Sequence, residues 1–151
     1  VMKRLSFLYL TLLFVFFNLS AYAQSEPVTW ESKLVKTGES TYELQLTANT
    51  QDNWIIYSQH IGEDGPIPTS FEVYLPEGAS LEGPFQEPDN GIESKDELFE
   101  MTLLKFKGPA TFTQTIISEK ELDSIAGEIN FMTCDNKRCL PPATVSFKTI
   151  L

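Results

Sequence analysis

The chain has 151 residues, two cysteines, one histidine and a formal net charge of −10. This length is typical of a single domain with one hydrophobic core, and two cysteines are too few to replace such a core with a disulfide scaffold. The negative charge excludes nucleic-acid binding, which requires lysine and arginine side chains to neutralise phosphates.

Residues 1–23 have the layout of a secretory signal peptide. Two basic residues precede an apolar run over residues 5–17, and residues 21–23 (Ala-Tyr-Ala) offer a small-x-small cleavage site. The alternative is an uncleaved membrane anchor, but the run is shorter than the roughly 20 residues that a membrane span needs. We therefore expect cleavage before Gln24, a mature domain over residues 24–151 with no membrane span, and export to the periplasm, where disulfides persist.

Short runs in the mature part alternate apolar and polar residues, as strands do when they bury one face. Residues 41–49 show this most clearly, with apolar side chains at the even positions from 42 to 48. Segments rich in glycine, proline and asparagine separate the runs and predict turns, and we expect residues 78–95 to form a long loop. The predicted strands cover residues 28–36, 41–49, 54–58, 70–75, 98–107, 110–116, 127–132 and 144–150.

This series of short strands, with no convincing helix after the signal peptide, predicts an all-β fold, an immunoglobulin-like antiparallel β-sandwich. A small β-barrel is the alternative, because alternation alone does not separate the two architectures well. We expect one domain and a monomeric protein, and the sequence shows no internal repeat.

The reactive groups of the chain are concentrated in one short segment that holds both Cys134 and Cys139. The four intervening residues allow a local disulfide. Closing so small a loop removes little entropy from the unfolded chain, which favours redox exchange over stapling. The residues by themselves leave both interpretations open, a structural disulfide and a redox-active pair.

Other kinds of site have weaker support. The one histidine, His60, lies in a segment rich in glycine and proline, and no sequence neighbour is suited to orient it for catalysis. A structural zinc site normally uses four ligands, often two cysteine pairs, and this chain has one pair. We expect no bound metal, with a copper-binding protein as an alternative because a reduced cysteine pair can hold Cu(I).

The cysteine segment, Cys-x4-Cys-Leu-Pro-Pro over residues 134–142, resembles the N-terminal periplasmic domain of the thiol:disulfide interchange protein DsbD. Residues 96–99 (Asp-Glu-Leu-Phe) resemble the cap loop of that family, and residues 53–57 (Asn-Trp-Ile-Ile-Tyr) resemble its aromatic strand. Residues 65–71 are similar to the stand-alone, Bacteroidetes-type members. The resemblance extends over essentially the whole mature chain.

The resemblance implies an immunoglobulin-like domain that works without a cofactor, through its redox-active disulfide. Cys139 matches the cysteine that attacks a partner, and Cys134 matches the more buried, resolving cysteine. Tyr57 would pack against the pair, and the acids of the cap would lie near the thiols. The cap itself would comprise Asp96, Glu97, Leu98 and Phe99.

The resemblance also implies the partners. Such a domain takes electrons from a thioredoxin-like protein that is fed by a membrane electron donor, and passes them to periplasmic disulfide isomerases or cytochrome c maturation proteins. This would make the chain an electron-transfer domain with thiol-disulfide oxidoreductase activity. The alternative is a non-catalytic immunoglobulin-like binding module, whose structural disulfide would have a reduction potential below about −300 mV.

The sequence departs from the family pattern in three respects. The cysteine loop is one residue shorter than in the proteobacterial pattern, and the leading hydrophobic position of the cap is Leu98, followed by Phe99. The sequence also lacks the family's membrane domain and its thioredoxin-like Cys-x-x-Cys domain. We therefore expect either a free-standing domain or one part of a split system.

Overall fold

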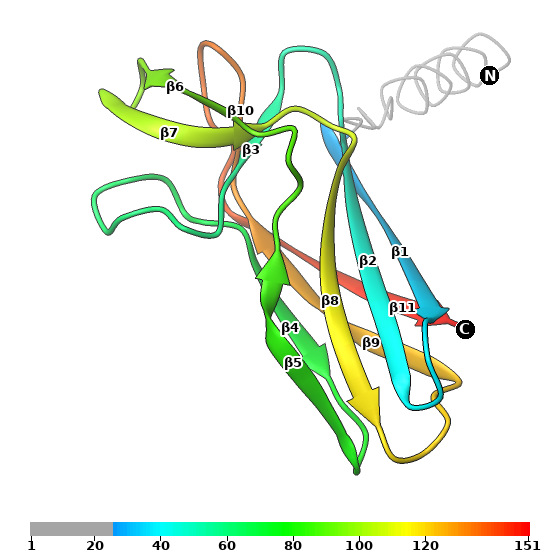
Figure 1. Ribbon diagram of the computed structural model, residues 1–151. Coiled ribbons are helices and arrows are strands. Elements are labelled where there is room, and N and C mark those ends of the chain that lie inside the picture. The colour runs from blue at the N-terminus through cyan, green and yellow to red at the C-terminus, as the bar shows by residue number, and fades with distance from the viewer. Residues whose placement is uncertain (1–25) are drawn as a thin grey trace, which may run out of the picture.

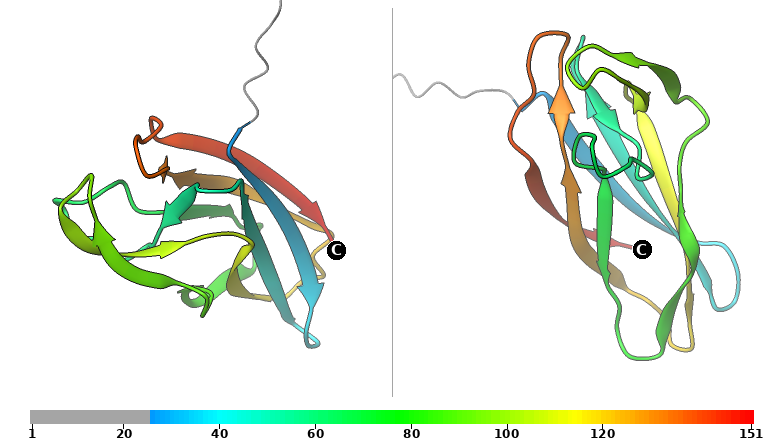
Figure 2. Two further views of the ribbon diagram at one scale, coloured as in Figure 1. Left: turned by 90° about the horizontal axis from the view of Figure 1, so that it is seen from above. Right: turned by 90° about the vertical axis from the view of Figure 1, so that its left-hand side faces the viewer.

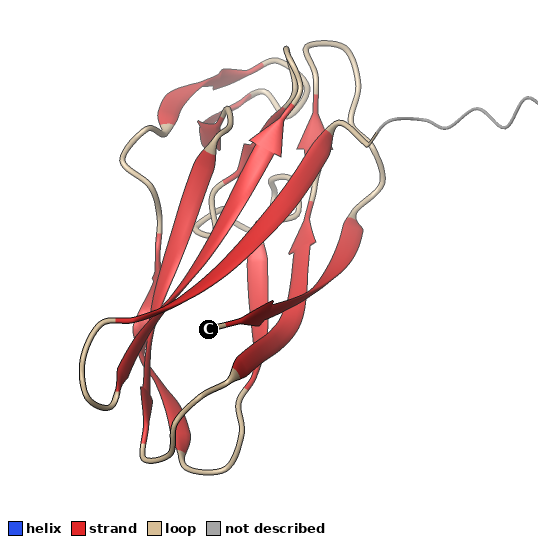
Figure 3. Cartoon of the chain, turned by 90° about the vertical axis from the view of Figure 1, so that its right-hand side faces the viewer, coloured by secondary structure: helices blue, strands red, loops and turns tan. Residues whose placement is uncertain are grey.

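A computed structural model describes residues 26–151, and the predicted signal peptide lies outside the described residues. The described part consists of strands and connecting turns, without a helix (Figures 1 and 3). Residues 26–151 therefore contain no helix that could cross a membrane. The strands are β1 (Val28–Lys36), β2 (Thr41–Thr50), β3 (Ile55–Tyr57), β4 (Ser70–Tyr74), β5 (Ala79–Gln86), β6 (Ile92–Asp96), β7 (Met101–Phe106), β8 (Ala110–Ser118), β9 (Ser124–Phe131), β10 (Thr133–Cys134) and β11 (Ala143–Ile150).

The strands form three antiparallel sheets. A sheet with the order β1-β2-β8-β5 packs against a sheet with the order β11-β9-β4, and the turned views show these two layers (Figure 2). A smaller sheet with the order β10-β3-β7-β6 lies at one end of the sandwich (Figure 1). The fold is thus the immunoglobulin-like antiparallel β-sandwich that the sequence predicts, and the barrel alternative is not adopted.

Aromatic side chains from both layers fill the core. Trp30 of β1 contacts Phe131 of β9 with ring centroids 5.6 Å apart, and Phe112 of β8 contacts Phe71 of β4 at 5.1 Å. Phe106 of β7 contacts Phe112 at 5.4 Å, which joins the small sheet to the main core. Each such pair stabilises the fold through the apolar area that it buries, and its ring–ring contact adds about 0.5–1.5 kcal/mol to that stabilisation.

The predicted alternation is confirmed in the central strands. In β2 the even positions from 42 to 48 are buried and the odd positions are partly exposed. β8 alternates in the same way from Ala110 to Ile116 and pairs with β2 in an antiparallel register. These two central strands therefore present one apolar face to the opposite layer.

The prediction of one long loop over residues 78–95 is wrong, because this segment contains β5 and β6. Both are edge strands, where proline and glycine are tolerated because one side of the strand has no partner. β5 shifts register between Glu82 and Gln86, around Gly83 with a φ of 71°. The buried Gln114 side chain donates hydrogen bonds of 3.1 Å to the carbonyls of Glu82 and Gly83. These two carbonyls therefore have hydrogen-bond donors although the strand pairing is interrupted there.

Two adjacent residues of β8 offer a direct test of this packing. Ile116 is 0% exposed and Ile117 is 38% exposed. We expect Ile116→Ala to lower the free energy of unfolding by about 2–5 kcal/mol, because it leaves a cavity in the core. Ile117→Ala should cost less than about 1 kcal/mol. Urea denaturation of both variants measures the difference, and equal losses would contradict this register.

Candidate functional site

Cys134 and Cys139 form a disulfide at the end of the small sheet, with their Cα atoms 4.0 Å apart. Cys134 belongs to β10 and pairs with Ile55 of β3. Cys134 is 1% exposed, whereas Cys139 is partly exposed. The two cysteines are therefore unequal in burial, and Cys139 is the more accessible of the two.

The loop between the cysteines is held by its own backbone and by Asp135. The Asp135 N–H donates to the carbonyl of Arg138 at 2.9 Å, and the Leu140 N–H donates to the carbonyl of Thr133 at 3.0 Å. The Asp135 carboxylate accepts hydrogen bonds from the N–H groups of Lys137 and Arg138, both at 2.8 Å. These two N–H donors are the main reason why the pKa of Asp135 is lowered.

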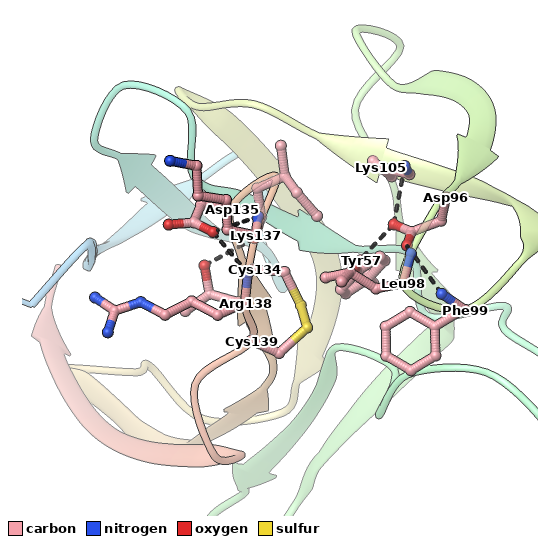
Figure 4. Close-up of a disulfide and its surroundings, with 12 residues drawn as sticks. Tyr57, Asp96, Leu98, Phe99, Lys105, Cys134, Asp135, Lys137, Arg138 and Cys139 are labelled. Atoms are coloured by element: carbon pink, nitrogen blue, oxygen red, sulfur yellow. Dashed lines mark hydrogen bonds and ion pairs between the residues drawn. A yellow bond between two sulfur atoms is a disulfide. The ribbon is translucent and has the colours of Figure 1, made fainter.

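A second turn, over residues 97–100, joins β6 to β7 and lies beside the disulfide (Figure 4). Asp96 closes this hairpin opposite Met101. Its Oδ1 atom accepts hydrogen bonds from the N–H groups of Leu98 at 2.9 Å and Phe99 at 3.2 Å. The Asp96 carboxylate thus fixes the turn in the same way that Asp135 fixes the cysteine loop.

The turn places the Phe99 ring among the side chains that surround the disulfide. The ring is perpendicular to that of Tyr57, with centroids 6.0 Å apart. Phe99 also belongs to the apolar cluster around Tyr57, Leu103 and Cys134, against which Cys139 packs. This second cluster is separate from the main core and is built around the disulfide.

The second oxygen of Asp96 anchors the turn to the sheet. Asp96 Oδ2 accepts a hydrogen bond of 3.1 Å from the Tyr57 hydroxyl and lies 2.9 Å from Lys105 Nζ (Figure 4). The side chain of Asp96 is 7% exposed and that of Lys105 is 16% exposed. Four donors therefore converge on one nearly buried carboxylate, which satisfies both of its oxygens.

The protonation states in this network follow from its geometry. Burial alone would raise the pKa of Asp96, but the hydrogen bonds from Lys105 and from the two N–H groups of the turn, together with the Lys105 charge, hold it below its ordinary value. Burial, and then the negative charge of Asp96, raise the pKa of Tyr57 far above its ordinary value. Tyr57 is therefore a neutral hydrogen-bond donor to an ionised Asp96.

A cavity of about 450 Å³ opens beside the disulfide. Its lining includes Cys134 and Asp135 of the cysteine segment and Leu98 of the turn. Its floor is one face of the small sheet, with Ile55 of β3 and Lys105 of β7. The cavity is large enough to admit several side-chain groups next to the buried sulfur.

The structure brings most of the predicted site residues together. Cys134, Cys139, Tyr57, Asp96 and Phe99 form one connected group. Leu98 is 44% exposed and lines the cavity, while Glu97 is exposed and also lines it. The roles assigned to these residues from the resemblance stay predictions.

Sequence reasoning missed Lys105. The available signal was that Lys105 lies on the same face of β7 as the buried Leu103, because a lysine that is not fully exposed requires a partner. His60 is exposed, and its backbone N–H donates to Ser58 Oγ at 2.9 Å. Among residues 26–151 no group of three or more His, Cys, Asp or Glu side chains could hold a metal ion.

No protein-family model matches the sequence, and no curated protein is significantly similar to it. Solved structures with a similar fold include the N-terminal periplasmic domain of ScsB from Proteus mirabilis, with 14% identity and a TM-score of 0.51 over 80% of this chain and 44% of that chain. The reduced DsbD N-terminal domain from Neisseria meningitidis has 14% identity and a TM-score of 0.49 over 82% of this chain and 83% of that chain. The GAE domain of GGA2p from Saccharomyces cerevisiae has 12% identity and a TM-score of 0.49 over 83% of this chain and 91% of that chain. The similarity to the ScsB domain supports the sandwich fold, and a shared fold does not by itself define a function.

The Asp96 network predicts a pH-dependent contribution to stability. Because the folded-state pKa of Asp96 is lowered, its contribution is complete above the unfolded pKa of about 3.9 and is lost as the pH falls through the folded value. We expect Asp96→Asn to lower the free energy of unfolding by about 1–3 kcal/mol at pH 7. The difference from the unsubstituted protein should shrink as the pH falls below about 4.

Denaturation at a series of pH values measures this effect. Glu97→Gln is the matched control, since it removes an adjacent carboxylate that is exposed and makes no hydrogen bond within residues 26–151. This control should leave the pH profile unchanged. A constant difference between Asp96→Asn and the unsubstituted protein at all pH values would show that the ionised form of Asp96 does not anchor the turn.

Proposed function

We propose that this protein is a periplasmic thiol:disulfide exchange domain that passes electrons between redox partners through Cys134 and Cys139. One observation carries the proposal: the disulfide joins a buried cysteine, Cys134, to a partly exposed one, Cys139, inside an apolar cluster that includes Phe99 of the turn over residues 97–100. A disulfide that served only to staple the fold would not require such surroundings. The structural similarity to the ScsB periplasmic domain is consistent with the proposal.

The chemistry needs no cofactor beyond the sulfur pair. In the reduced domain, the Cys139 thiolate attacks a sulfur of a partner disulfide, forms a mixed disulfide and releases one partner thiolate. The Cys134 thiolate then attacks the Cys139 sulfur, re-forms the Cys134–Cys139 disulfide and releases the second partner thiolate. Two electrons move to the partner, and the two protons of the domain's thiols go to the released partner thiolates. The same steps in reverse reload the domain from a reduced donor.

The turn over residues 97–100 would act as the cap in this scheme. Phe99 lies in the apolar cluster around the disulfide, and Asp96 holds the turn by four hydrogen-bonded or ionic contacts. Attack on a disulfide requires an approach to one of its sulfurs. Displacement of Phe99 would therefore widen access to the disulfide. With Phe99 in place, the turn would limit the reaction of the disulfide with thiols other than those of its partners.

The partners and the compartment are part of the proposal. A periplasmic location is compatible with the disulfide, since cytosolic thiols are kept reduced. A thioredoxin-like donor, fed by a membrane electron donor, would reduce the domain. Periplasmic disulfide isomerases or cytochrome c maturation proteins would then receive the electrons.

Single-cysteine variants test the proposal directly. With an added disulfide-containing partner, the reduced Cys134→Ser variant should accumulate a mixed disulfide through Cys139, because the resolving sulfur is missing. The Cys139→Ser variant should form little, because Cys134 is 1% exposed. Non-reducing electrophoresis with mass spectrometry of the linked peptides measures both. If neither variant forms a mixed disulfide and the pair has a potential below about −300 mV, the disulfide is structural.

The cap assignment gives a separate prediction. Phe99→Ala should speed reduction of the disulfide by a small dithiol roughly tenfold. This rate change corresponds to a decrease of about 1.4 kcal/mol in the activation free energy. Leu81→Ala, which truncates an exposed side chain on β5, is the control and should not change the rate. Stopped-flow measurement of thiol consumption gives both rates. Equal rates for Phe99→Ala and the unsubstituted protein would remove the cap from the mechanism.

A further inference from the structure

The charges of this protein are distributed very unevenly. Of the nine basic residues in the described part of the chain, five line the cavity or belong to the loop between the cysteines: Lys95, Lys105, Lys107, Lys137 and Arg138. Of its 21 acidic residues, the same region holds three: Asp96, Glu97 and Asp135. Glu100, the remaining acid of the turn, raises that number to four. Within residues 26–151 the rest of the domain therefore carries 17 acids and four basic residues, so the disulfide lies in a region with a formal charge of +1 while the remainder is strongly acidic.

The acids of this region are largely committed to internal contacts. Asp96 is neutralised by Lys105 and bound by the turn. Asp135 accepts the two N–H groups of the cysteine loop. The two carboxylates that remain free, Glu97 and Glu100, are exposed on the turn.

Four of the five basic side chains, in contrast, remain available, and the exception is Lys105, which pairs with Asp96. Lys95 and Lys107 are exposed, line the cavity, and make no hydrogen bond or ion pair within residues 26–151. Lys137 and Arg138 lie on the side of the disulfide away from Lys105 and Phe99 (Figure 4), and the Arg138 guanidinium lies 5.9 Å from the centre of the Trp54 ring. Cationic residues therefore line the cavity beside Cys134 and also belong to the loop between the two cysteines.

The cavity also has an apolar part that an incoming segment could cover. Ile92 of β6 is 59% exposed and Leu98 of the turn is 44% exposed, and both line the cavity. Exposed apolar groups beside unpaired lysines offer contacts to a segment that carries an acidic and an apolar residue together.

We propose that this cavity binds an acidic and apolar segment next to the reacting cysteine of the redox partner. This inference rests on the proposed function and specifies the kind of partner it serves. The carboxylates of the segment lie against Lys95 and Lys107, and its apolar side chain covers Ile92. Because the remainder of the domain is strongly negative, an acidic partner is attracted only to the end that holds the disulfide, which orients the encounter.

Two synthetic peptides of equal length test this preference. Each contains one cysteine and is supplied as the symmetric peptide disulfide, with aspartate and leucine beside the cysteine in one and lysine and leucine in the other. The reduced domain transfers two electrons to either peptide disulfide, releases two peptide thiols, and becomes oxidised at Cys134–Cys139. We expect the acidic peptide to react about tenfold faster at low ionic strength. The ratio should fall toward one at 1 M salt, where the Debye length is about 3 Å.

A pair of charge-matched variants locates the effect. Lys95→Glu combined with Lys107→Glu should abolish or reverse the preference for the acidic peptide. Lys33→Glu combined with Lys148→Glu makes the same change in net charge at exposed lysines of β1 and β11, and should leave the preference unchanged. Urea denaturation confirms that both double variants are folded.

The outcomes separate this inference from the proposed function. Equal rates with both peptides, or an equal loss of preference in both double variants, overturn the acidic-partner inference while exchange itself stands. If neither peptide oxidises the domain, the proposed function fails and the inference fails with it.

Discussion

The ionised carboxylate of Asp96 is the contact on which the arrangement of the site depends. One of its oxygens binds the backbone of the turn, and the other binds Tyr57 and Lys105 from two neighbouring strands. A charge that is nearly buried is costly unless every acceptor position is used, and here both oxygens have two donors. The position of Phe99 relative to the disulfide is therefore set by electrostatics and hydrogen bonding as well as by apolar contact.

The two faces of the small sheet contribute side chains to two separate apolar clusters. In β3, Ile56 faces the main core while the next residue, Tyr57, belongs to the cluster around the disulfide. In β7, Phe106 and Lys105 divide in the same way, because successive side chains of a strand point to opposite faces. The rigid sandwich thus supports the backbone of the site, while the side chains of the site remain separate from the core that stabilises the fold.

The sequence predicted the strands with strong alternation, such as β2 and β8, and the meeting of Tyr57, Asp96 and Phe99 at the cysteines followed from the family resemblance. It did not predict β5 and β6, whose glycines and prolines are typical of loops and are tolerated here because both strands lie at sheet edges. It also did not reveal Lys105 as the partner of Asp96. That contact joins residues from two strands of a hairpin, and the composition of the segment containing the first strand is typical of a loop.

The backbone bonds of the cysteine loop have a consequence for the redox cycle. The bonds from Asp135 N–H to Arg138 and from Leu140 N–H to Thr133, like the contacts of the Asp135 carboxylate, involve no sulfur atom. None of these contacts depends on the bond between the sulfurs, so one loop conformation can serve both oxidation states. In the proposed exchange reaction the chain would then need little reorganisation, and the energetic cost would fall on the sulfur chemistry and on displacement of the turn over residues 97–100.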